Sequence, residues 1–242
     1  MKNKTSESNS NGLLKELVAM LRDGSFGDRD TLPKEEDLAQ ILKVSRTALR
    51  DVLKILEQEG YIIRVKKKGT VINRRALDAP FRIDIEYEFS QLLELAHHHP
   101  SYEILSVEKM LSTEDLASQL ETQTGLVVYK VSKLVRADGL PVIYCEDFLL
   151  EKNFKNPNVD PEIFKKSVYD ILDETCGLRI DFNVTRLVPI IADDLIINTL
   201  GYQGPLLMFR ETSFTNKLQP VLYSNIYWRG DFFDLQIVRK KY

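Results

Sequence analysis

The chain contains the stretch Leu32-Pro33-Lys34-Glu35-Glu36-Asp37-Leu38-Ala39, then Val44-Ser45-Arg46-Thr47-Ala48-Leu49-Arg50, and further on Lys66-Lys67-Lys68-Gly69-Thr70-Val71. Proline is favoured in the first turn of a helix, so Thr31 and Pro33 predict the start of a helix that ends near Val44. Ser45 predicts the cap of a second helix. The order is therefore helix, short break, helix and basic turn.

Apolar residues at regular spacing extend this pattern on both sides. They recur at helical spacing from Leu13 to Leu21, and Gly24 indicates the end of that first helix. Gly60 separates the last helix from a hairpin expected over residues 61–73. This order is typical of a winged helix-turn-helix, so the first 75 residues are predicted to bind DNA. The expected core residues are Leu13, Leu14, Leu17, Val18, Leu21, Leu38, Ala39, Ile41, Leu42, Leu49, Val52, Leu53 and Leu56.

The third predicted helix carries basic residues on one face, because Arg46, Arg50 and Lys54 are four residues apart. We expect Arg46 and Thr47 to read bases, since residues near the start of a recognition helix reach deepest into the major groove. Arg50 and Lys54 are expected at phosphates. The alternative, a solvated helix beside an incidental basic turn, is disfavoured by the order of all the elements. The predicted DNA-binding residues are Lys34, Ser45, Arg46, Thr47, Arg50, Lys54, Lys66, Lys67, Lys68, Gly69 and Thr70.

Length and charge indicate two domains with different partners. The 242 residues exceed the usual size of one domain. Residues 1–75 carry 16 Lys and Arg against 11 Asp and Glu, and residues 76–242 carry 17 against 25. The net charges are therefore +5 and -8. A basic first part suits phosphate contacts, whereas an acidic second part is repelled by a duplex and is expected to hold a ligand site or a subunit interface.

Cysteines and hydropathy predict a cytoplasmic protein. Cys145 and Cys176 lack paired spacing, which favours buried, reduced thiols over a redox pair. Residues 1–12 are polar and lack the apolar core of a signal peptide. No later stretch approaches membrane-spanning length.

After a predicted linker at residues 74–80, the pattern changes to strands alternating with short helices. A capping box at residues 112–115 precedes a short helix, and Asp138-Gly139 predicts a hairpin turn. Further helices are expected at residues 161–175 and 192–200. The expected strands cover residues 102–110, 127–135, 142–150, 179–189, 206–214, 221–228 and 232–238. The second domain is therefore predicted to be antiparallel α+β.

The first domain resembles the GntR family of bacterial transcription regulators from about Leu13 to Asn73. The resemblance rests on the Leu-Pro helix start, the Val-Ser-Arg start of the recognition helix and the glycine-bearing wing. Lys34 and Glu36 replace a serine and an arginine of the family pattern, and Lys67 replaces the first glycine of the wing. Because that arginine commonly contacts DNA in the family, Glu36 removes one expected contact and adds repulsion. Lys34 and Lys67 can supply charge nearby, and an operator different from the usual one is expected.

Nearly all of residues 81–240 resemble the UTRA effector-binding domain of the HutC branch of GntR regulators. The resemblance implies a fold similar to chorismate lyase that serves as a sensor of small metabolites, including sugar phosphates and amino acids. Fold similarity to a lyase does not imply lysis. The motifs that carry it are Arg136-Ala137-Asp138-Gly139-Leu140-Pro141, Ser167-Val168-Tyr169-Asp170, Leu200-Gly201 and Trp228-Arg229-Gly230-Asp231.

The resemblance also implies where an effector binds. Two arginines of phosphosugar-binding members correspond to Lys133 and Val135, and an acidic residue corresponds to Glu146. Two carboxylates at residues 86–90, where a phosphate loop is expected, oppose a phosphate. We therefore expect a neutral sugar, an aromatic or an amine-bearing metabolite, oriented by Lys133 and Glu146 and stacked on Trp228; alternatively, Lys133 and Glu146 pair at the sheet surface and Trp228 belongs to the core. The predicted effector-binding residues are Tyr87, Phe89, Ser90, Lys133, Val135, Glu146, Leu222, Ser224 and Trp228.

Catalytic and metal chemistry are not predicted. No histidine lies on a predicted pocket strand, neither cysteine has a nearby base in sequence, and no glycine-rich phosphate loop is present. His97-His98-His99 cannot all face one ion from a helix, so no metal or cofactor is expected. Arg229 and Asp231 are expected to brace a turn. The remaining alternative is an enzyme of lyase-like fold fused to a DNA-binding module.

Together these patterns predict a ligand-responsive transcription regulator that binds double-stranded operator DNA as a homodimer. A repressor is expected, with an activator left open because that choice depends on operator position. The predicted organisation is a flexible N-terminus at residues 1–11, a winged helix-turn-helix at 12–73, a linker at 74–80 and a UTRA domain at 81–242.

Overall fold

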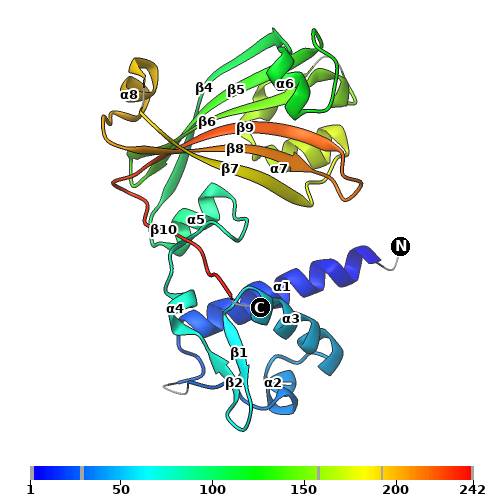
Figure 1. The fold of residues 1–242 in the computed structure, drawn as a ribbon. Helices are drawn as coiled ribbons and strands as arrows, with labels where there is room; N and C mark the ends of the chain where they lie inside the picture. Colours follow the sequence, from blue (N-terminus) through cyan, green and yellow to red (C-terminus); the bar gives the residue numbers. More distant parts are fainter. Residues whose placement is uncertain (1–2, 28–29, 157–158, 192, 241–242) are drawn as a thin grey trace. The chain divides into compact units, whose positions relative to one another are not determined.

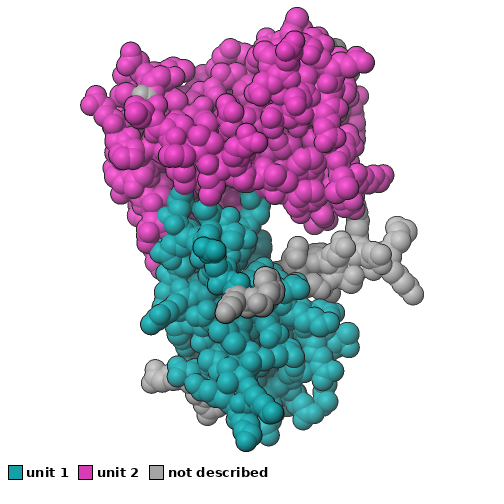
Figure 2. Space-filling model, viewed as in Figure 1, with its two compact units in different colours: residues 1–86, 235–242 teal, residues 87–234 magenta. Residues whose placement is uncertain are grey.

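The computed structural model describes residues 3–27, 30–156, 159–191 and 193–240. The chain divides into two compact units, which Figure 2 distinguishes by colour. The first unit comprises residues 1–86 together with residues 235–242, and the second comprises residues 87–234. The first unit therefore contains both ends of the chain.

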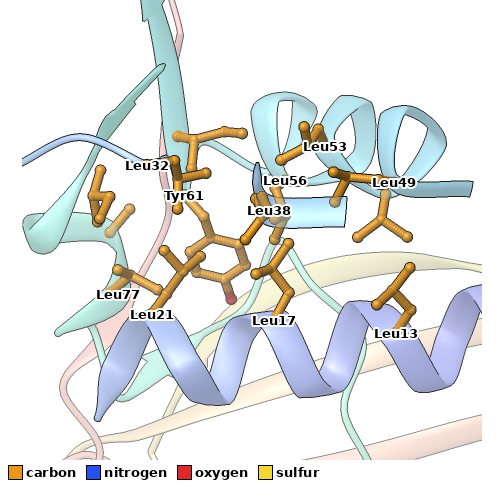
Figure 3. Close-up of a cluster of buried hydrophobic side chains, with 14 of the residues drawn as sticks. Leu13, Leu17, Leu21, Leu32, Leu38, Leu49, Leu53, Leu56, Tyr61 and Leu77 are labelled. Carbon is orange, nitrogen blue, oxygen red and sulfur yellow. The ribbon is translucent and has the colours of Figure 1, made fainter. Parts of the chain in front are cut away.

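The first unit contains three helices followed by a hairpin, as predicted. The elements are α1 (Asn3–Arg22), α2 (Glu35–Ile41), α3 (Arg46–Gln58), β1 (Ile62–Val65) and β2 (Gly69–Ile72), and the two strands pair antiparallel (Figure 1). Leu17 of α1, Leu38 of α2 and Leu56 of α3 lie in one buried cluster with Tyr61 (Figure 3). Burial of these side chains away from water is what holds the three helices together.

The ends of α2 and α3 explain how the two helices are joined. Ser45 begins α3, because its side chain accepts a hydrogen bond from the Ala48 N–H at 3.2 Å. Lys43 adopts a φ of 54° in the turn between the helices. Ile41, predicted in the core, is 55% exposed. Leu42, which was also predicted in the core, does pack against it, since it follows Leu38 by four residues and shares its face.

Residues 74–77, predicted as part of the linker, form the helix α4 (Arg74–Leu77). Ala76 and Leu77 are buried in the core of the first unit. Arg74 Nη1 donates to the carbonyl oxygen of Leu21 at 2.7 Å and so satisfies a backbone acceptor at the end of α1. These contacts attach α4 to the winged helix, so the linker prediction was wrong at these residues.

The start of α1 also differs from the prediction. The helix begins at Asn3, although residues 1–11 were expected to be a flexible tail. Once the stripe from Leu13 to Leu21 fixes the helix, each residue added outward gains a backbone hydrogen bond without a new nucleation step.

The C-terminal end of the chain belongs to the first unit. The strand predicted at residues 232–238 is restricted to β10 (Leu235–Gln236), which pairs in parallel with β3 (Phe81–Arg82). Val238 packs against the core of the first unit, and Lys240 Nζ donates to the carbonyl oxygen of Glu57 near the end of α3. The alternating pattern indicated a strand but not its partner.

The second unit is built on a six-stranded antiparallel sheet with the order β4-β5-β6-β9-β8-β7. Its strands are β4 (Pro100–Leu111), β5 (Val127–Ala137), β6 (Leu140–Leu150), β7 (Phe182–Ile190), β8 (Leu206–Phe214) and β9 (Pro220–Arg229). Its α-helices are α5 (Phe89–Leu95), α6 (Glu114–Gln119), α7 (Val168–Asp170) and α8 (Asp194–Leu200). The predicted α+β class is confirmed.

The helix predicted at residues 161–175 is broken into three pieces. A 3₁₀ turn at Pro161–Lys165 ends where Lys166 becomes extended, and α7 is followed by a π-helical turn at Ile171–Cys176. Ser167 restarts the helix, because its side chain accepts a hydrogen bond from the Tyr169 N–H at 3.2 Å.

Strand register determines which side chains share a face of the sheet. Lys133 lies opposite Cys145, and Asp147 lies opposite Ser224. Because directly opposed residues share a face and neighbours along a strand alternate, these four side chains lie on one face, called here the Lys133 face. Glu146 lies on the other, the Glu146 face.

Helices cover both faces. Ile196 and Leu200 of α8 pack with Tyr144 and Tyr227 on the Glu146 face. On the Lys133 face, the helical turns at residues 161–176 supply Phe164, Ile171 and Leu172, which pack with Tyr129. The Lys133 face also holds polar side chains, among them Lys133, Asp147 and Ser224.

Candidate nucleic-acid interface and ligand face

The exposed side of α3 carries the predicted recognition residues. Arg46, Thr47, Arg50 and Lys54 are all exposed, while the opposite side of the helix buries Leu49, Val52, Leu53 and Leu56. The structure therefore brings the predicted base-reading and phosphate-contacting residues onto one surface. An exposed helix of this kind fits the width of the major groove.

The arginines of this surface are paired with the first turn of α2. Arg46 Nη1 lies 2.9 Å from Glu36 Oε1, and Arg50 Nε lies 2.7 Å from Glu35 Oε2. The hydrogen bond from Arg50 to Glu35 raises the pKa of Arg50. From the sequence, Glu36 was expected to remove one DNA contact and to repel the duplex. Its ion pair with Arg46 was not predicted, because Arg46 belongs to another helix.

The wing places three lysines at the tip of the β1–β2 hairpin. Val65 pairs with Gly69, and the exposed Lys66, Lys67 and Lys68 lie between them. Lys67 has a φ of 68°, in the left-handed region that costs a residue with a Cβ atom about 1–2 kcal/mol. The resemblance places a glycine at this position, and the backbone conformation explains why glycine suits it. The other predicted DNA-binding residues, Lys34, Ser45, Gly69 and Thr70, are exposed or half-buried.

The Lys133 face holds a buried polar cluster. Lys133 Nζ lies 2.8 Å from Asp147 Oδ2, and the other oxygen of Asp147 accepts hydrogen bonds from Ser224 Oγ at 2.7 Å and Cys145 Sγ at 3.2 Å. Burial by itself raises the pKa of Asp147, but the Lys133 ammonium and the hydrogen bonds lower it further than burial raises it. Asp147 is therefore an anion held by three donors.

Glu211 extends this cluster towards β7. Glu211 is on β8, opposite Ser224 of β9, and accepts a hydrogen bond from the Thr185 hydroxyl of β7. Glu211 is 8% exposed and Asp147 is 3% exposed. Asp147, Cys145 and Glu211 were not predicted from the sequence. Their places follow from strand alternation only when the register is known.

Glu146 does not share the site with Lys133. Its Oε1 lies 2.6 Å from Lys130 Nζ, and the Tyr144 hydroxyl donates to it at 3.1 Å. All three side chains lie on the Glu146 face. The expected cooperation of Lys133 with Glu146 is therefore corrected to a pairing of Lys133 with Asp147, the next residue along β6.

The predicted aromatic residue of the site is buried. Trp228 is 5% exposed and its ring packs against Phe89, Phe209 and Phe233 at centroid distances of 5.7, 5.1 and 4.8 Å. Its indole N–H has no hydrogen-bond partner among the described residues. Trp228 is a core residue with an unused donor, as one part of the alternative expected; the other part, a pair of Lys133 with Glu146 at the sheet surface, is not found, because Lys133 pairs with Asp147 and Glu146 pairs with Lys130.

The other predicted effector residues occupy different parts of the unit. Val135, fully buried, shares the Lys133 face with Ser224. Leu222 lies further along β9 in the cluster with Tyr129 and Phe164. Tyr87, Phe89 and Ser90 are half-buried at the start of the unit. Burial raises the pKa of Tyr102 although hydrogen bonding to Ser90 lowers it.

A cavity of about 440 Å³ opens elsewhere on the same face. It is lined by Val107, Lys109, Tyr129, Val159, Asp160, Pro161 and Phe164. Tyr129 and Lys133 lie four residues apart on β5, so the cavity lies about 13 Å along the strand from Lys133. Lys109 at its edge is already paired with Glu151 at 2.7 Å.

Two other sequence signals have structural explanations. Arg229 lies 2.7 Å from Asp231, donates to the Pro141 carbonyl at 3.0 Å and stacks on Tyr202, so it forms the expected turn brace. His98 and His99 both hydrogen-bond to Asp138. In the described part of the chain, no group of His, Cys, Asp and Glu side chains is arranged to hold a metal ion. Within that same part, no helix is long and apolar enough to cross a membrane.

Comparison with known families agrees with this arrangement. Residues 9–72 match the family described as bacterial regulatory proteins, gntR family, and residues 95–234, more than half of the chain, match the UTRA domain family. The two units thus define a transcription regulator that binds DNA through one unit and carries an effector-binding domain in the other. The chain belongs to the GntR-type regulators with a UTRA domain, a class of regulators and not of enzymes.

Individual relatives are similar along most of their length. The chain is 21% identical over 221 residues to the HTH-type transcriptional repressor NagR of Bacillus subtilis, covering 90% of this chain and 89% of NagR. It is 24% identical over 177 residues to the regulator TreR of the same organism, covering 73% of each.

Solved structures share the fold. The possible transcriptional regulator YydK of Bacillus subtilis has a TM-score of 0.73 and 20% identity, covering 96% of this chain and 99% of YydK. PhnF of Mycobacterium smegmatis has a TM-score of 0.60 and 19% identity, covering 94% of this chain and 98% of PhnF.

Proposed function

We propose that this regulator is a repressor that leaves its operator when an uncharged or amine-bearing metabolite binds to the Lys133 face. NagR, similar along most of the chain, is named a repressor. Such a ligand changes DNA binding only if it has different affinities for the DNA-bound and the free conformation.

The observation that carries the proposed ligand class is the charge of the buried cluster. One ammonium, Lys133, lies with two carboxylates, Asp147 and Glu211, on the same face. A phosphate would have to displace Asp147 from Lys133 and would then lie beside a buried anion, which is unfavourable at low dielectric. A hydroxyl or an amine can instead donate to the carboxylates. The indole N–H of Trp228 offers one donor to the same ligand.

The ligand class is tested with matched pairs of compounds. Purified protein bound to DNA from its own upstream region is exposed to neutral sugars, amino sugars and aromatic amines, each beside its phosphate ester. We expect operator release by a compound without phosphate and a weaker effect from its ester. A phosphosugar that binds more tightly than its unphosphorylated counterpart would overturn the proposal.

Two serine variants locate the ligand. Ser224, 3% exposed on the Lys133 face, donates to Asp147, whereas Ser132, 5% exposed, lies on the Glu146 face. Ser224→Ala should raise the ligand concentration needed for operator release by about tenfold, since it removes one hydroxyl beside the ligand. Ser132→Ala loses the same group from the other face and should leave the response unchanged. Equal effects would place the ligand elsewhere.

We also propose that the protein acts as a homodimer, because two related half-sites are read most simply by two copies of the winged helix. The edge strand β7 supports this, since it exposes Val184 by 59% and Leu187 by 47%. Light scattering should give twice the mass of the chain, and Val184→Lys should reduce it. Leu218→Lys, an exposed position in the β8–β9 turn, is the control. A monomeric wild type that binds its operator would contradict the dimer.

A further inference from the structure

The ion pairs between α2 and α3 engage the two arginines that are predicted to contact DNA. Arg46, the predicted base reader, is held by Glu36, and Arg50, the predicted phosphate contact, is held by Glu35. The side chains of Arg46 and Glu36 are each 62% exposed, so this pair lies on the surface of α3 that is predicted to face DNA. The arginines of this recognition helix are therefore already partnered before a duplex arrives.

We propose that Glu36, assisted by Glu35, determines the specificity of DNA binding by reducing affinity for random DNA more than affinity for the operator. The inference rests on DNA binding by α3. In this role Glu36 acts through Arg46, so it is a positioning residue.

Random DNA offers phosphates to the protein. Cationic side chains that bind these phosphates release the counterions condensed on the duplex, and this release favours binding. An arginine whose charge is neutralised by a carboxylate releases few counterions, and the carboxylate itself is repelled by the duplex. Glu36 and Glu35 thus remove two cations from the sequence-independent part of binding.

An operator offers guanine edges as well. Glu36 Oε1 pairs with Nη1 of Arg46 at 2.9 Å, and the guanidinium has a second edge, formed by Nε and Nη2, that can face a base. Guanine O6 and N7 accept two parallel hydrogen bonds from such an edge. Arg46 can therefore read guanine while it stays paired with Glu36. The ion pair also restricts the rotamers of Arg46 before DNA binds, so less side-chain entropy is lost on binding. The operator loses less from the pairing than random DNA does.

Acidic residues in the first turn of a helix also stabilise the helix itself, an effect distinct from the pairing of Glu36 with Arg46. Glu35, Glu36 and Asp37 all lie in the first turn of α2, where each stabilises the helix through its dipole. Asp37 is exposed, and the described residues provide no ion pair for it. Asp37→Asn therefore removes the same charge from the same turn without releasing an arginine.

The test compares Glu36→Gln with Asp37→Asn on two duplexes. One is the sequence selected from a random library by the wild-type protein, and the other is a scrambled duplex of equal composition. For Glu36→Gln we expect affinity for scrambled DNA to rise about three- to tenfold, with a salt dependence steeper by about one ion. Operator affinity should rise less, so the ratio of the two affinities falls. Asp37→Asn should change both affinities by one common factor.

The Arg46→Ala background shows whether Glu36 acts through Arg46. In that background, Glu36→Gln should change the affinity ratio no more than Asp37→Asn does. A ratio that stays constant in Glu36→Gln, or that falls equally with Arg46 absent, would overturn the inference. Failure of the wild type to prefer any selected duplex would instead overturn DNA recognition by α3, and the two failures are therefore distinguishable.

Discussion

Val238 lies against Gly60, so that a Cβ atom on Gly60 would come within 2.9 Å of Val238 Cγ1. Gly60 follows α3 and has a φ of 79°, a conformation that glycine adopts without strain. The carbonyl oxygen of Gly60 also accepts a hydrogen bond from Asn73 Nδ2 at 2.9 Å. The end of the recognition helix, the end of the wing and the C-terminal segment thus meet at one residue.

Gly60→Ala should destabilise the first unit through both the backbone conformation and the contact with Val238. Gly24 is the matched control, because its φ is 77° and a Cβ atom there meets nothing within 4 Å. We expect Gly60→Ala to lose about 1–3 kcal/mol more than Gly24→Ala in chemical denaturation followed by circular dichroism. Adding Val238→Ala should recover part of that difference. Equal losses in the two glycine variants would show that the C-terminal segment does not pack there.

Asp147→Asn should strongly destabilise the second unit. The substitution leaves the Lys133 ammonium buried without its counterion, which costs about 3–5 kcal/mol. Trp228, the single tryptophan of the sequence, lies in this unit, so its fluorescence reports unfolding directly. Glu146→Gln is the control, since its partner Lys130 keeps 27% of its side chain exposed and remains solvated. A loss in Asp147→Asn no larger than in the control would refute the buried pair.

The sequence pattern did not distinguish the roles of two adjacent acidic residues on β6, Glu146 and Asp147. The strand, its hairpin and its alternation were predicted correctly from Asp138-Gly139 and the apolar pattern. Whether residue 146 or 147 shares a face with Lys133 depends on register, and a shift of one residue exchanges the faces. The structure selects Asp147, which reverses the expected role of Glu146.

The DNA-binding unit was more predictable than the ligand face because its signals are local. A serine cap, helical spacing and a glycine at a positive φ each specify their own backbone. The placement of β10 beside β3 and the pairing of Glu36 with Arg46 join residues on different elements. Such pairings depend on tertiary packing, and the chain pattern alone does not encode which elements meet.

Asp138 should make stability depend on pH in the acid range. Hydrogen bonds from the His98 ring, the His99 N–H and the His99 ring lower its pKa from 3.8 to about 2. Because the folded value lies below the unfolded one, this stabilisation is complete above pH 3.8 and is lost as the pH falls through about 2. Asp138→Asn should therefore flatten the fall in melting temperature over that range, followed by Trp228 fluorescence. An unchanged or steeper fall in the variant would contradict the assignment.

Removal of Arg46 and removal of the wing lysines should change DNA affinity in different ways. Arg46 is held at the start of α3 by Glu36, whereas Lys66, Lys67 and Lys68 lie exposed at the hairpin tip. Arg46→Ala should weaken the selected operator by about ten- to a hundredfold and scrambled DNA much less, because a base contact carries sequence information. Replacing the three lysines by alanine should weaken both duplexes alike and reduce the salt slope by about one for each phosphate that the wing no longer binds.

Arg75→Ala is the control for these variants, since Arg75 is an exposed arginine of the same unit outside the predicted interface. It removes one positive charge, so any small, uniform loss that it causes measures the general effect of charge. Fluorescence anisotropy at several salt concentrations gives both the affinity ratio and the slope. If Arg46→Ala lost affinity equally on both duplexes, Arg46 would be a phosphate contact and base reading would belong to Thr47 or to another residue of α3. A larger loss of discrimination in the lysine variant would assign sequence reading to the wing.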